Sequence, residues 1–218
     1  MPEWGERAAA LTLPAAGILF LVLAVLETHR PRQAAAIEGR WATNAALFAL
    51  VLGAAVFAAP QRAVGMALEG WESGFLAWLQ QAGGPWAALA AGLVLLDGLA
   101  YALHRLMHLR PFWRLHAVHH ADRHMDATTA LRHHPGEYLV NAALGGAVMV
   151  LCGLPAWVAA IHGLLIMLSD LWTHANVALP QRLERALSTV FVTPGWHRVH
   201  HSADPQHFGT NYGSILSV

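Results

Sequence analysis

The sequence predicts an all-α integral membrane protein with about three spanning helices, a helical hairpin and a histidine-rich helical cap. Three observations support this fold class. Of the 218 residues, 56% are hydrophobic and only 12% are charged, a composition typical of membrane proteins rather than soluble globules. Apolar runs recur with lengths close to the roughly 20 residues that a helix needs to cross a bilayer. The histidines cluster where these runs end.

The first two predicted spans lie near the N-terminus. Residues 10–26 form an apolar run that ends at the charged turn 27–31. This run lacks a basic leader and a clear cleavage motif, so we expect a retained span rather than a signal peptide. Residues 42–59 contain no charged side chain and lie between Trp41 and Pro60, which predicts the second span.

A third span and a hairpin follow. Residues 86–107 are apolar apart from Asp97, His104 and Arg105, and they predict the third span. The apolar run at 138–172 contains Pro155, which disrupts a helix interior but suits a first turn. We therefore expect a hairpin of two helices, at about 138–152 and 155–173.

The stretch at 65–79, between the second and third spans, is rich in glycine and contains Trp71 and Trp78. Tryptophan is enriched at the depth of lipid headgroups, so this stretch is predicted to be an interfacial helix or loop. An ordinary exposed loop is the alternative. We expect residues 1–218 to form a single membrane-embedded domain, because this length suits one domain.

The placement of arginine predicts the orientation of the protein. The loop at 28–41 contains three arginines, and most of the others follow the third span or the hairpin, whereas only Arg7 and Arg62 lie on the opposite side. By the positive-inside rule, this loop and every histidine cluster are predicted to be cytoplasmic, in what we expect to be a bacterial inner membrane. The net charge of zero does not indicate a nucleic-acid partner.

Three histidine clusters carry the chemistry of the chain. They are His104-x-x-x-His108, His116-x-x-His119-His120 and His197-x-x-His200-His201. Positions i, i+3 and i+4 share one face of a helix, so each cluster is predicted to aim its imidazoles at one point. Imidazole suits iron, zinc, copper or nickel rather than magnesium or calcium. Eight imidazoles exceed what one ion can use, which predicts a two-metal site; surface histidines near lipid headgroups are the alternative.

Several further residues are candidates for supporting roles. Asp97 lies on the same helix face as His104 and is predicted either to orient an imidazole or to bond a neighbouring span. Asp170 lies one turn before His174 and is a candidate orienting partner or outer ligand. Five histidines are predicted to be solvated or hydrogen-bonded rather than metal ligands: His29, His124, His133, His162 and His207.

These motifs, which lie between about residues 97 and 213, resemble the sterol desaturase / fatty acid hydroxylase superfamily of integral-membrane, non-haem di-iron enzymes. The matching stretches are 97–108, 113–120, 126–137, 174–176, 193–202 and 211–213. Three spaced histidine clusters in this order make the pattern specific. The family usually continues into a Trp-Asp-x-x-Phe-Gly-Thr segment, which this sequence does not contain.

The resemblance implies a set of ten metal ligands. They are His104, His108, His116, His119, His120, His134, His174, His197, His200 and His201. His134 is preferred to His133 because a proline follows it, as in the family's His-Pro-x-Glu motif.

The resemblance also implies the reaction. It would be O₂-dependent hydroxylation or desaturation of a C–H bond in a fatty acyl or sterol-like lipid, as a step of lipid biosynthesis. Two iron ions would be the cofactor, and zinc can substitute in expressed protein. The sequence contains no dinucleotide fingerprint or phosphate loop, so a separate ferredoxin-type or cytochrome-type donor with its reductase is expected.

Two other functions fit a histidine-rich membrane protein. A metal transport or storage protein would need ionisable residues across the middle of the bilayer, whereas these histidines gather at one end of the spans. A membrane hydrolase with two zinc ions would need no electrons, so O₂ consumption with a supplied reductant separates it from an oxygenase.

Overall fold

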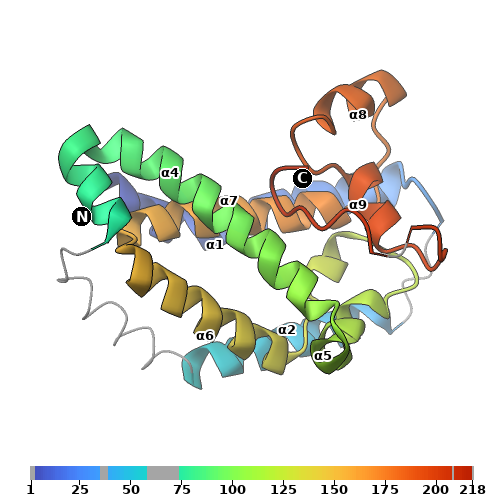
Figure 1. Cartoon of the computed structure of the whole chain (residues 1–218). Coiled ribbons are helices and arrows are strands. Elements are labelled where there is room, and N and C mark those ends of the chain that lie inside the picture. Colours follow the sequence, from blue (N-terminus) through green and yellow to red (C-terminus); the bar gives the residue numbers. More distant parts are fainter. Residues whose placement is uncertain (1–2, 35–38, 58–73, 208, 218) are drawn as a thin grey trace.

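A computed structural model describes residues 3–34, 39–57, 74–207 and 209–217 (Figure 1). Within these ranges the secondary structure is helical, apart from one isolated antiparallel bridge between Phe191 and Leu216. The helices are α1 (Glu3–His29), α2 (Arg40–Phe57), α4 (Phe75–Met107), α5 (Arg110–His120), the short 3-10 helix η2 (Ala127–Leu131), α6 (Pro135–Cys152), α7 (Ala156–His174), α8 (Gln181–Leu187) and α9 (Pro194–His200). The predicted all-α fold class is confirmed.

Four helices in the described part of the chain are long and apolar enough to cross a membrane. They are Ala10–His29 within α1, and then α4, α6 and α7. The predicted first span, third span and hairpin correspond to these helices. The helix α2 covers the predicted second span as far as Phe57, but its apolar part, Arg40–Val56, is shorter than the four candidate spans, and residues 58 and 59 lie outside the described residues.

The helix α4 contains a break near its start. Gly84 has φ 76°, a left-handed conformation that favours glycine, and Pro85 follows it. The predicted span at 86–107 therefore begins where the second part of α4 begins. Of the predicted interfacial stretch, residues 65–73 lie outside the described residues, and 74–79 lead into the first part of α4. There Phe75 and Trp78 are exposed, as expected of an aromatic belt at a membrane surface.

The hairpin forms as predicted, with α6 and α7 joined by a tight turn. Gly153 ends α6 in the left-handed conformation (φ 62°), and Pro155 is the residue that precedes the first turn of α7. The helix α7 lies at the centre of the bundle, where it contacts α1, α4, α9 and η2. At Gly92 of α4 a side chain would overlap Val158 of α7, so glycine permits the close approach of these two helices.

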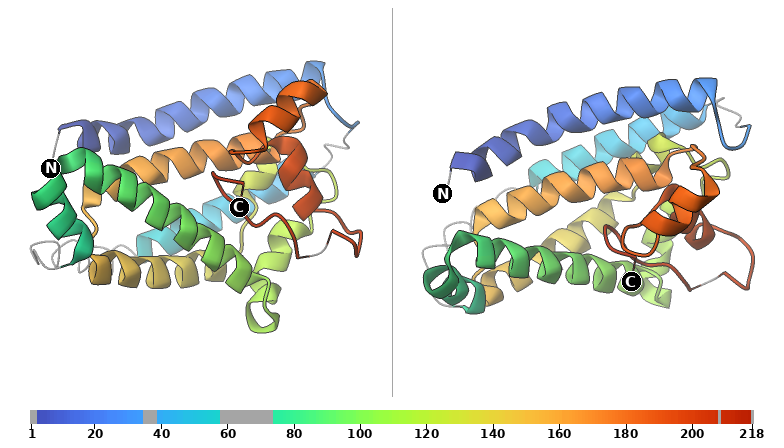
Figure 2. Two further views of the ribbon diagram at one scale, coloured as in Figure 1. Left: turned by 45° about the horizontal axis from the view of Figure 1, so that its top comes forward. Right: turned by 90° about the horizontal axis from the view of Figure 1, so that it is seen from above.

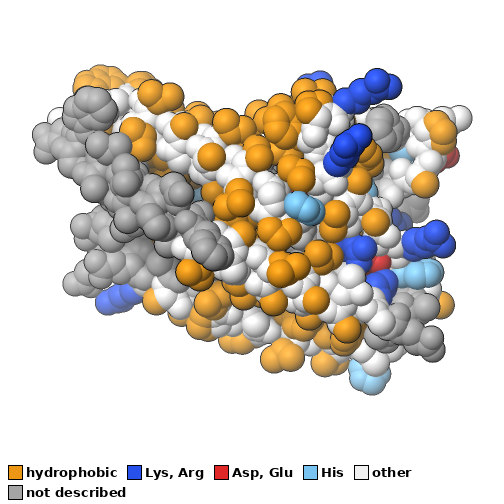
Figure 3. Space-filling model, turned by 90° about the horizontal axis from the view of Figure 1, so that it is seen from below, with side chains coloured by type: hydrophobic (Ala, Val, Ile, Leu, Met, Phe, Trp, Pro, Cys, Tyr) orange, Lys and Arg blue, Asp and Glu red, His pale blue; other side chains and the backbone are white. Residues whose placement is uncertain are grey.

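The ends of the helices that carry the predicted ligands meet at one end of the bundle. The C-terminal ends of α4 and α7 lie there together with α5 and α9, far from the N-terminus (Figure 2). On the face seen from below, hydrophobic side chains cover most of the described bundle, whereas charged and histidine side chains gather mostly toward this end (Figure 3). The candidate site therefore lies at the ends of the apolar helices rather than at their middle.

Candidate metal centre

The structure brings nine of the ten predicted ligands together in two groups. Within each group one nitrogen atom per ring can be chosen such that all lie within 4.8 Å of one another. The five-histidine group consists of His104, His108, His116, His120 and His200, and the four-histidine group consists of His119, His174, His197 and His201. Their assignment as ligands stays a prediction, since the structure carries no ion.

Each H-x-x-H-H motif is divided between the two groups, contrary to the expectation that its three imidazoles would converge on one point. In the motif of α5, His116 and His120 belong to the five-histidine group and His119 to the other. In the motif of α9 the division is reversed, because His200 alone joins the five-histidine group. The physical reason is that neighbouring residues lie about 100° apart around a helix, so positions i+3 and i+4 diverge.

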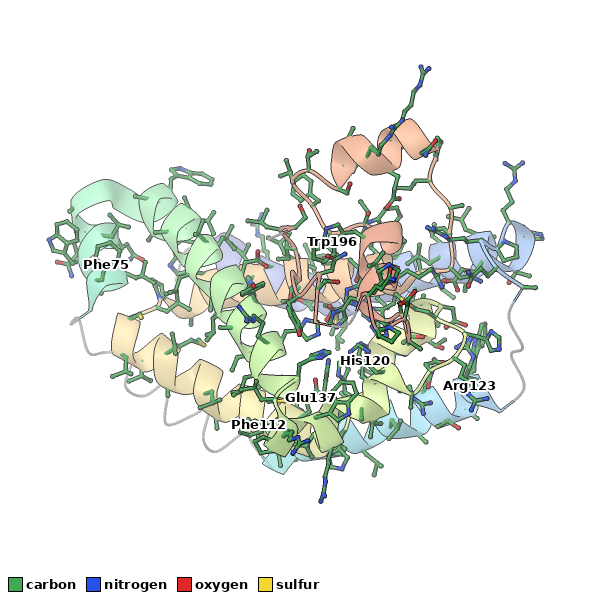
Figure 4. The ribbon with its side chains drawn as sticks, turned by 45° about the vertical axis from the view of Figure 1, so that its right-hand side comes forward. Phe75, Phe112, His120, Arg123, Glu137 and Trp196 are labelled. Atoms are coloured by element: carbon green, nitrogen blue, oxygen red, sulfur yellow. The ribbon has the colours of Figure 1, made fainter. Side chains whose placement is uncertain are left out.

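Local sequence places these imidazoles on short, well-defined helix ends. His104 lies in the last turn of α4 and His108 directly follows this helix, while Pro111 occupies the first turn of α5. Thr193 caps α9 by accepting a hydrogen bond from the Trp196 N–H at 3.3 Å. His174 is the last residue of α7. Figure 4 shows His120 and Glu137 at this end of the bundle, with Phe75 at the opposite end.

Five of the nine imidazoles have an oxygen atom beside Nδ1. The pairs are His104 with Tyr212 O (3.0 Å), His116 with Glu137 Oε1 (2.8 Å), His119 with Arg132 O (3.2 Å), His174 with Asp170 O (2.7 Å) and His200 with Thr210 O (2.8 Å). A carbonyl or carboxylate oxygen can only accept, so each Nδ1 donates a proton. In a neutral ring the lone pair then lies on Nε2, as in metal-binding histidines oriented by outer partners.

These lone pairs point at one another. His119 Nε2 lies 3.0 Å from His174 Nε2, which lies 3.1 Å from His197 Nε2. Because His119 and His174 both carry their proton on Nδ1, no proton is left between their Nε2 atoms. The buried Nε2 of His104 and both nitrogens of His201 also have no hydrogen-bond partner in the described part of the chain. A bound cation would separate the facing lone pairs and would give the unpartnered nitrogens a partner. The donor set therefore fits metal ions that prefer imidazole.

The pKa values agree with this role. Burial, followed by the neighbouring imidazoles, lowers the pKa of His119, His197 and His201 well below the ordinary 6.5. Burial also lowers the pKa of His108 to about 3 and that of His200 to about 4. The rings are therefore neutral at pH 7 and keep the lone pair that a metal ion needs.

His134, the tenth predicted ligand, lies in neither group. Its Nδ1 accepts a hydrogen bond from the Gly136 N–H at 2.9 Å and so caps the start of α6. Because a backbone N–H can only donate, the lone pair of His134 Nδ1 is engaged in this bond. The prediction of His134 as a ligand, which rested on the following proline, stays untested, while its contact in the structure is that of a helix cap.

His133, which the sequence analysis set aside, lies against the centre instead. Its ring stacks on that of His119 with centroids 4.5 Å apart, and its Nδ1 lies 3.3 Å from Glu137 Oε1. Desolvation opposes a charge on His133, but the Glu137 carboxylate outweighs it and raises the pKa of His133 above its ordinary value. His133 also forms a third group with His116 and Glu137, whose possible ligand atoms lie within 4.8 Å of one another, so it belongs to the surroundings of the centre.

The two aspartates predicted as partners of the ligands have different surroundings. The Asp97 carboxylate accepts hydrogen bonds from the backbone N–H groups of Ile215 and Leu216, each at 3.1 Å, rather than from an imidazole. The contact between Asp170 and His174 is made by the backbone carbonyl of Asp170. Among the described residues, no hydrogen bond joins the Asp170 carboxylate to a histidine.

Sequence reasoning missed the residues that hold the imidazoles in place. Glu137 was detectable, because a carboxylate in the first turn of an apolar helix needs a partner. Arg132, Thr210 and Tyr212 act through their backbone carbonyls, which no side-chain pattern reveals. The histidines excluded as ligands, apart from His133, lie outside both groups: His29 and His124 are exposed, His207 bonds Ser202, and His162 lies within α7.

Comparisons with known proteins agree with the site. Residues 89–218 match the model of the family described as fatty acid hydroxylase. The ornithine lipid hydroxylase OlsE of Rhizobium tropici is 34% identical over 128 residues, which cover 58% of this chain and 38% of that protein. The alkylglycerol monooxygenase of Danio rerio is 28% identical over 149 residues, covering 68% of this chain and 30% of that enzyme.

A third relative is the human alkylglycerol monooxygenase, 27% identical over 135 residues that cover 62% of this chain and 29% of the enzyme. The chain therefore spans less than two fifths of the length of each of these three relatives. No solved structure matches the chain. Because the family match covers more than half of the sequence and contains all nine grouped histidines, the chain belongs to the fatty acid hydroxylase family.

Proposed function

We propose that this chain is the catalytic part of a membrane hydroxylase that inserts one oxygen atom of O₂ into a C–H bond of a lipid. The observation that carries the proposal is the pair of histidine groups at the ends of membrane-spanning helices. The relatives named as lipid hydroxylase and monooxygenase support the reaction class and favour hydroxylation over desaturation. The balance is R–H + O₂ + 2 e⁻ + 2 H⁺ → R–OH + H₂O.

The nine imidazoles would hold two iron ions. When bound and reduced, these ions would activate O₂, of which one oxygen atom would enter the C–H bond and the other would leave as water. The protein fixes five of these imidazoles through the Nδ1 bonds described above. The four-histidine group offers one imidazole fewer than the other, and catalytic metal sites keep a position open for a reactant.

The location of the site favours a membrane lipid whose reactive carbon lies close to its polar headgroup. The imidazoles lie at the ends of α4 and α7, within one or two helical turns, about 5–10 Å, of the last apolar residues. A lipid could approach sideways from the bilayer and keep its chain in hydrocarbon. The packed helix ends exclude bulk water from the reacting carbon, which limits side reactions of the oxidant.

Electrons would come from a separate protein. The sequence contains no nucleotide-binding motif, and four arginines next to the site are exposed: Arg105, Arg110, Arg114 and Arg123. These residues suit the docking of an acidic ferredoxin-type or cytochrome-type carrier. We place this end of the molecule on the cytoplasmic side, since the arginines of the chain gather there.

The experiment is lipid mass spectrometry of cells with and without the protein, grown under isotopically labelled O₂. We expect a lipid that gains one labelled oxygen atom when the wild-type chain and a reductase system are present, and no such product with His200→Ala. The matched control is His124→Ala, an exposed histidine outside both groups, which should behave as wild type.

An unlabelled product, or turnover without O₂ consumption, would instead indicate a hydrolase with two zinc ions. Unchanged lipids, despite bound iron and a working electron donor, would contradict the proposal.

A further inference from the structure

The C-terminal segment, defined here as residues 209–217, is fastened to a carboxylate that lies inside a membrane-spanning helix. Asp97 is a buried residue of α4, about two helical turns before His104. Its Oδ1 accepts a hydrogen bond from the Ile215 N–H and its Oδ2 from the Leu216 N–H, both at 3.1 Å. A charged group within a span is costly, and these two donors offset part of that cost.

Further bonds hold the same segment from other sides. The Ser169 hydroxyl of α7 donates to Ser214 O at 2.6 Å, and the Asn211 side chain donates to Trp196 O of α9 at 2.9 Å. Asn211 has φ 59°, a left-handed conformation that asparagine tolerates, and a side chain on Gly213 would overlap the Leu216 carbonyl oxygen. The segment is thus held in a single backbone conformation.

This conformation aims two backbone carbonyls at the metal centre. Tyr212 O lies 3.0 Å from His104 Nδ1, and Thr210 O lies 2.8 Å from His200 Nδ1. Both histidines belong to the five-histidine group. The Nδ1 partners found for the four-histidine group, Asp170 O and Arg132 O, belong to other parts of the chain.

We propose that Asp97 is a positioning residue that acts mainly on the five-histidine group. By fixing Ile215 and Leu216, it places the carbonyls of Thr210 and Tyr212, and these set the proton position and ring direction of His200 and His104. Outer partners of this kind change metal affinity about 10–100-fold. The inference rests on the metal-binding part of the proposed function and not on the lipid or on O₂ chemistry.

The test measures zinc affinity with each group disabled in turn. In His174→Ala, which weakens the four-histidine group, adding Asp97→Asn should lower the zinc affinity of the remaining site about 10–100-fold. The asparagine amide keeps one oxygen that can accept, but its NH₂ group faces a backbone N–H, so one of the two bonds to Ile215 and Leu216 is lost. In His108→Ala, which weakens the five-histidine group, the same addition should change zinc affinity less than about 2-fold. Equal losses in both backgrounds, or none in either, would overturn the proposal.

Two further variants make the result decisive. Glu27 is a second carboxylate in a spanning helix. It accepts hydrogen bonds from the backbone N–H groups of Ala127 (2.9 Å) and Asn176 (2.6 Å), neither of which belongs to the C-terminal segment. Glu27→Gln in His174→Ala should therefore leave the affinity of the five-histidine group unchanged, and a loss matching that of Asp97→Asn would count against a specific role of Asp97.

If Asp97→Asn does not fold, Ser169→Ala loosens the same segment through Ser214 and should weaken zinc binding in His174→Ala but not in His108→Ala. An equal effect in both backgrounds would contradict the proposal. If the wild-type chain binds no metal, the proposed function itself is contradicted. This result differs from that of a wild-type chain that binds two ions while Asp97→Asn weakens both groups equally, which contradicts only the role of Asp97.

Discussion

The two histidine groups use the same kind of ligand but are held by different parts of the chain. In the five-histidine group, His104 and His200 depend on carbonyls of the C-terminal segment, and His116 depends on Glu137 of α6. In the four-histidine group, His174 bonds a carbonyl of its own helix, and His119 bonds the Arg132 carbonyl, which follows it by only 13 residues. The first group therefore depends on long-range tertiary contacts for its geometry, and the second depends more on local helix structure.

The difference in ligand number arises at one position. The helix α4 runs into His104-x-x-x-His108, whereas α7 ends in Asp170-x-x-x-His174. The two H-x-x-H-H motifs balance each other, since each gives two imidazoles to one group and one to the other. An aspartate where the other helix has a histidine thus leaves the four-histidine group with one imidazole fewer.

The largest expected effect is the loss of a ligand from either group. His200→Ala and His174→Ala should each lower bound metal from two ions to about one per chain. Each should also reduce lipid hydroxylation by more than about 100-fold, since the loss of an outer partner alone costs about 10–100-fold. Metal analysis and product formation measure the two effects. Exposed His29 provides the control, and an equal loss in His29→Ala would contradict the assignment.

A smaller effect is expected at Glu137. Glu137→Gln removes the charged acceptor of His116 Nδ1, so the zinc affinity of the five-histidine group should fall about 10–100-fold. Measured in the His174→Ala and His108→Ala backgrounds, the loss should be larger in the first. A larger loss in the second would mean that Glu137 acts mainly through His133, which stacks on His119.

Acid should destabilise the metal-free protein. In the folded chain, burial lowers the pKa of His197 and His201 well below 6.5 and that of His200 to about 4. Below pH 6.5 the unfolded chain takes up protons that the folded chain does not, so stability is greatest above this value and falls as the pH drops toward the folded pKa values. Thermal unfolding in detergent at about pH 7.5 and about pH 5.5 measures the change, and equal midpoints would contradict it.

The smallest effect concerns His134. Because it caps α6, His134→Ala should cost about 0.5–2 kcal/mol of stability while both metal ions stay bound, and His134→Asn should restore the stability. Unfolding midpoints and metal analysis of the two variants provide the check. Loss of an ion from His134→Ala would return His134 to the ligand set that the family motif implies.

Much of the fold followed from local patterns. Apolar length predicted α1, α4 and the hairpin, and Pro155 predicted the boundary within the hairpin to within a residue. These features depend on the few residues around them, so the sequence contains them directly. The spacing of the histidines likewise predicted eight of the nine histidines that the structure gathers, the family resemblance added His174, and the motifs predicted the family.

The sequence by itself thus determined the membrane helices, the histidine clusters and the family. Only the tertiary structure decided which imidazole joins which group, because that depends on how α5 and α9 face each other. It also decided that His133 rather than His134 lies against the centre, and that Asp97 bonds the C-terminal segment. These contacts join residues far apart in the chain, and many use backbone carbonyls, which every residue has and which therefore leave no mark in the sequence.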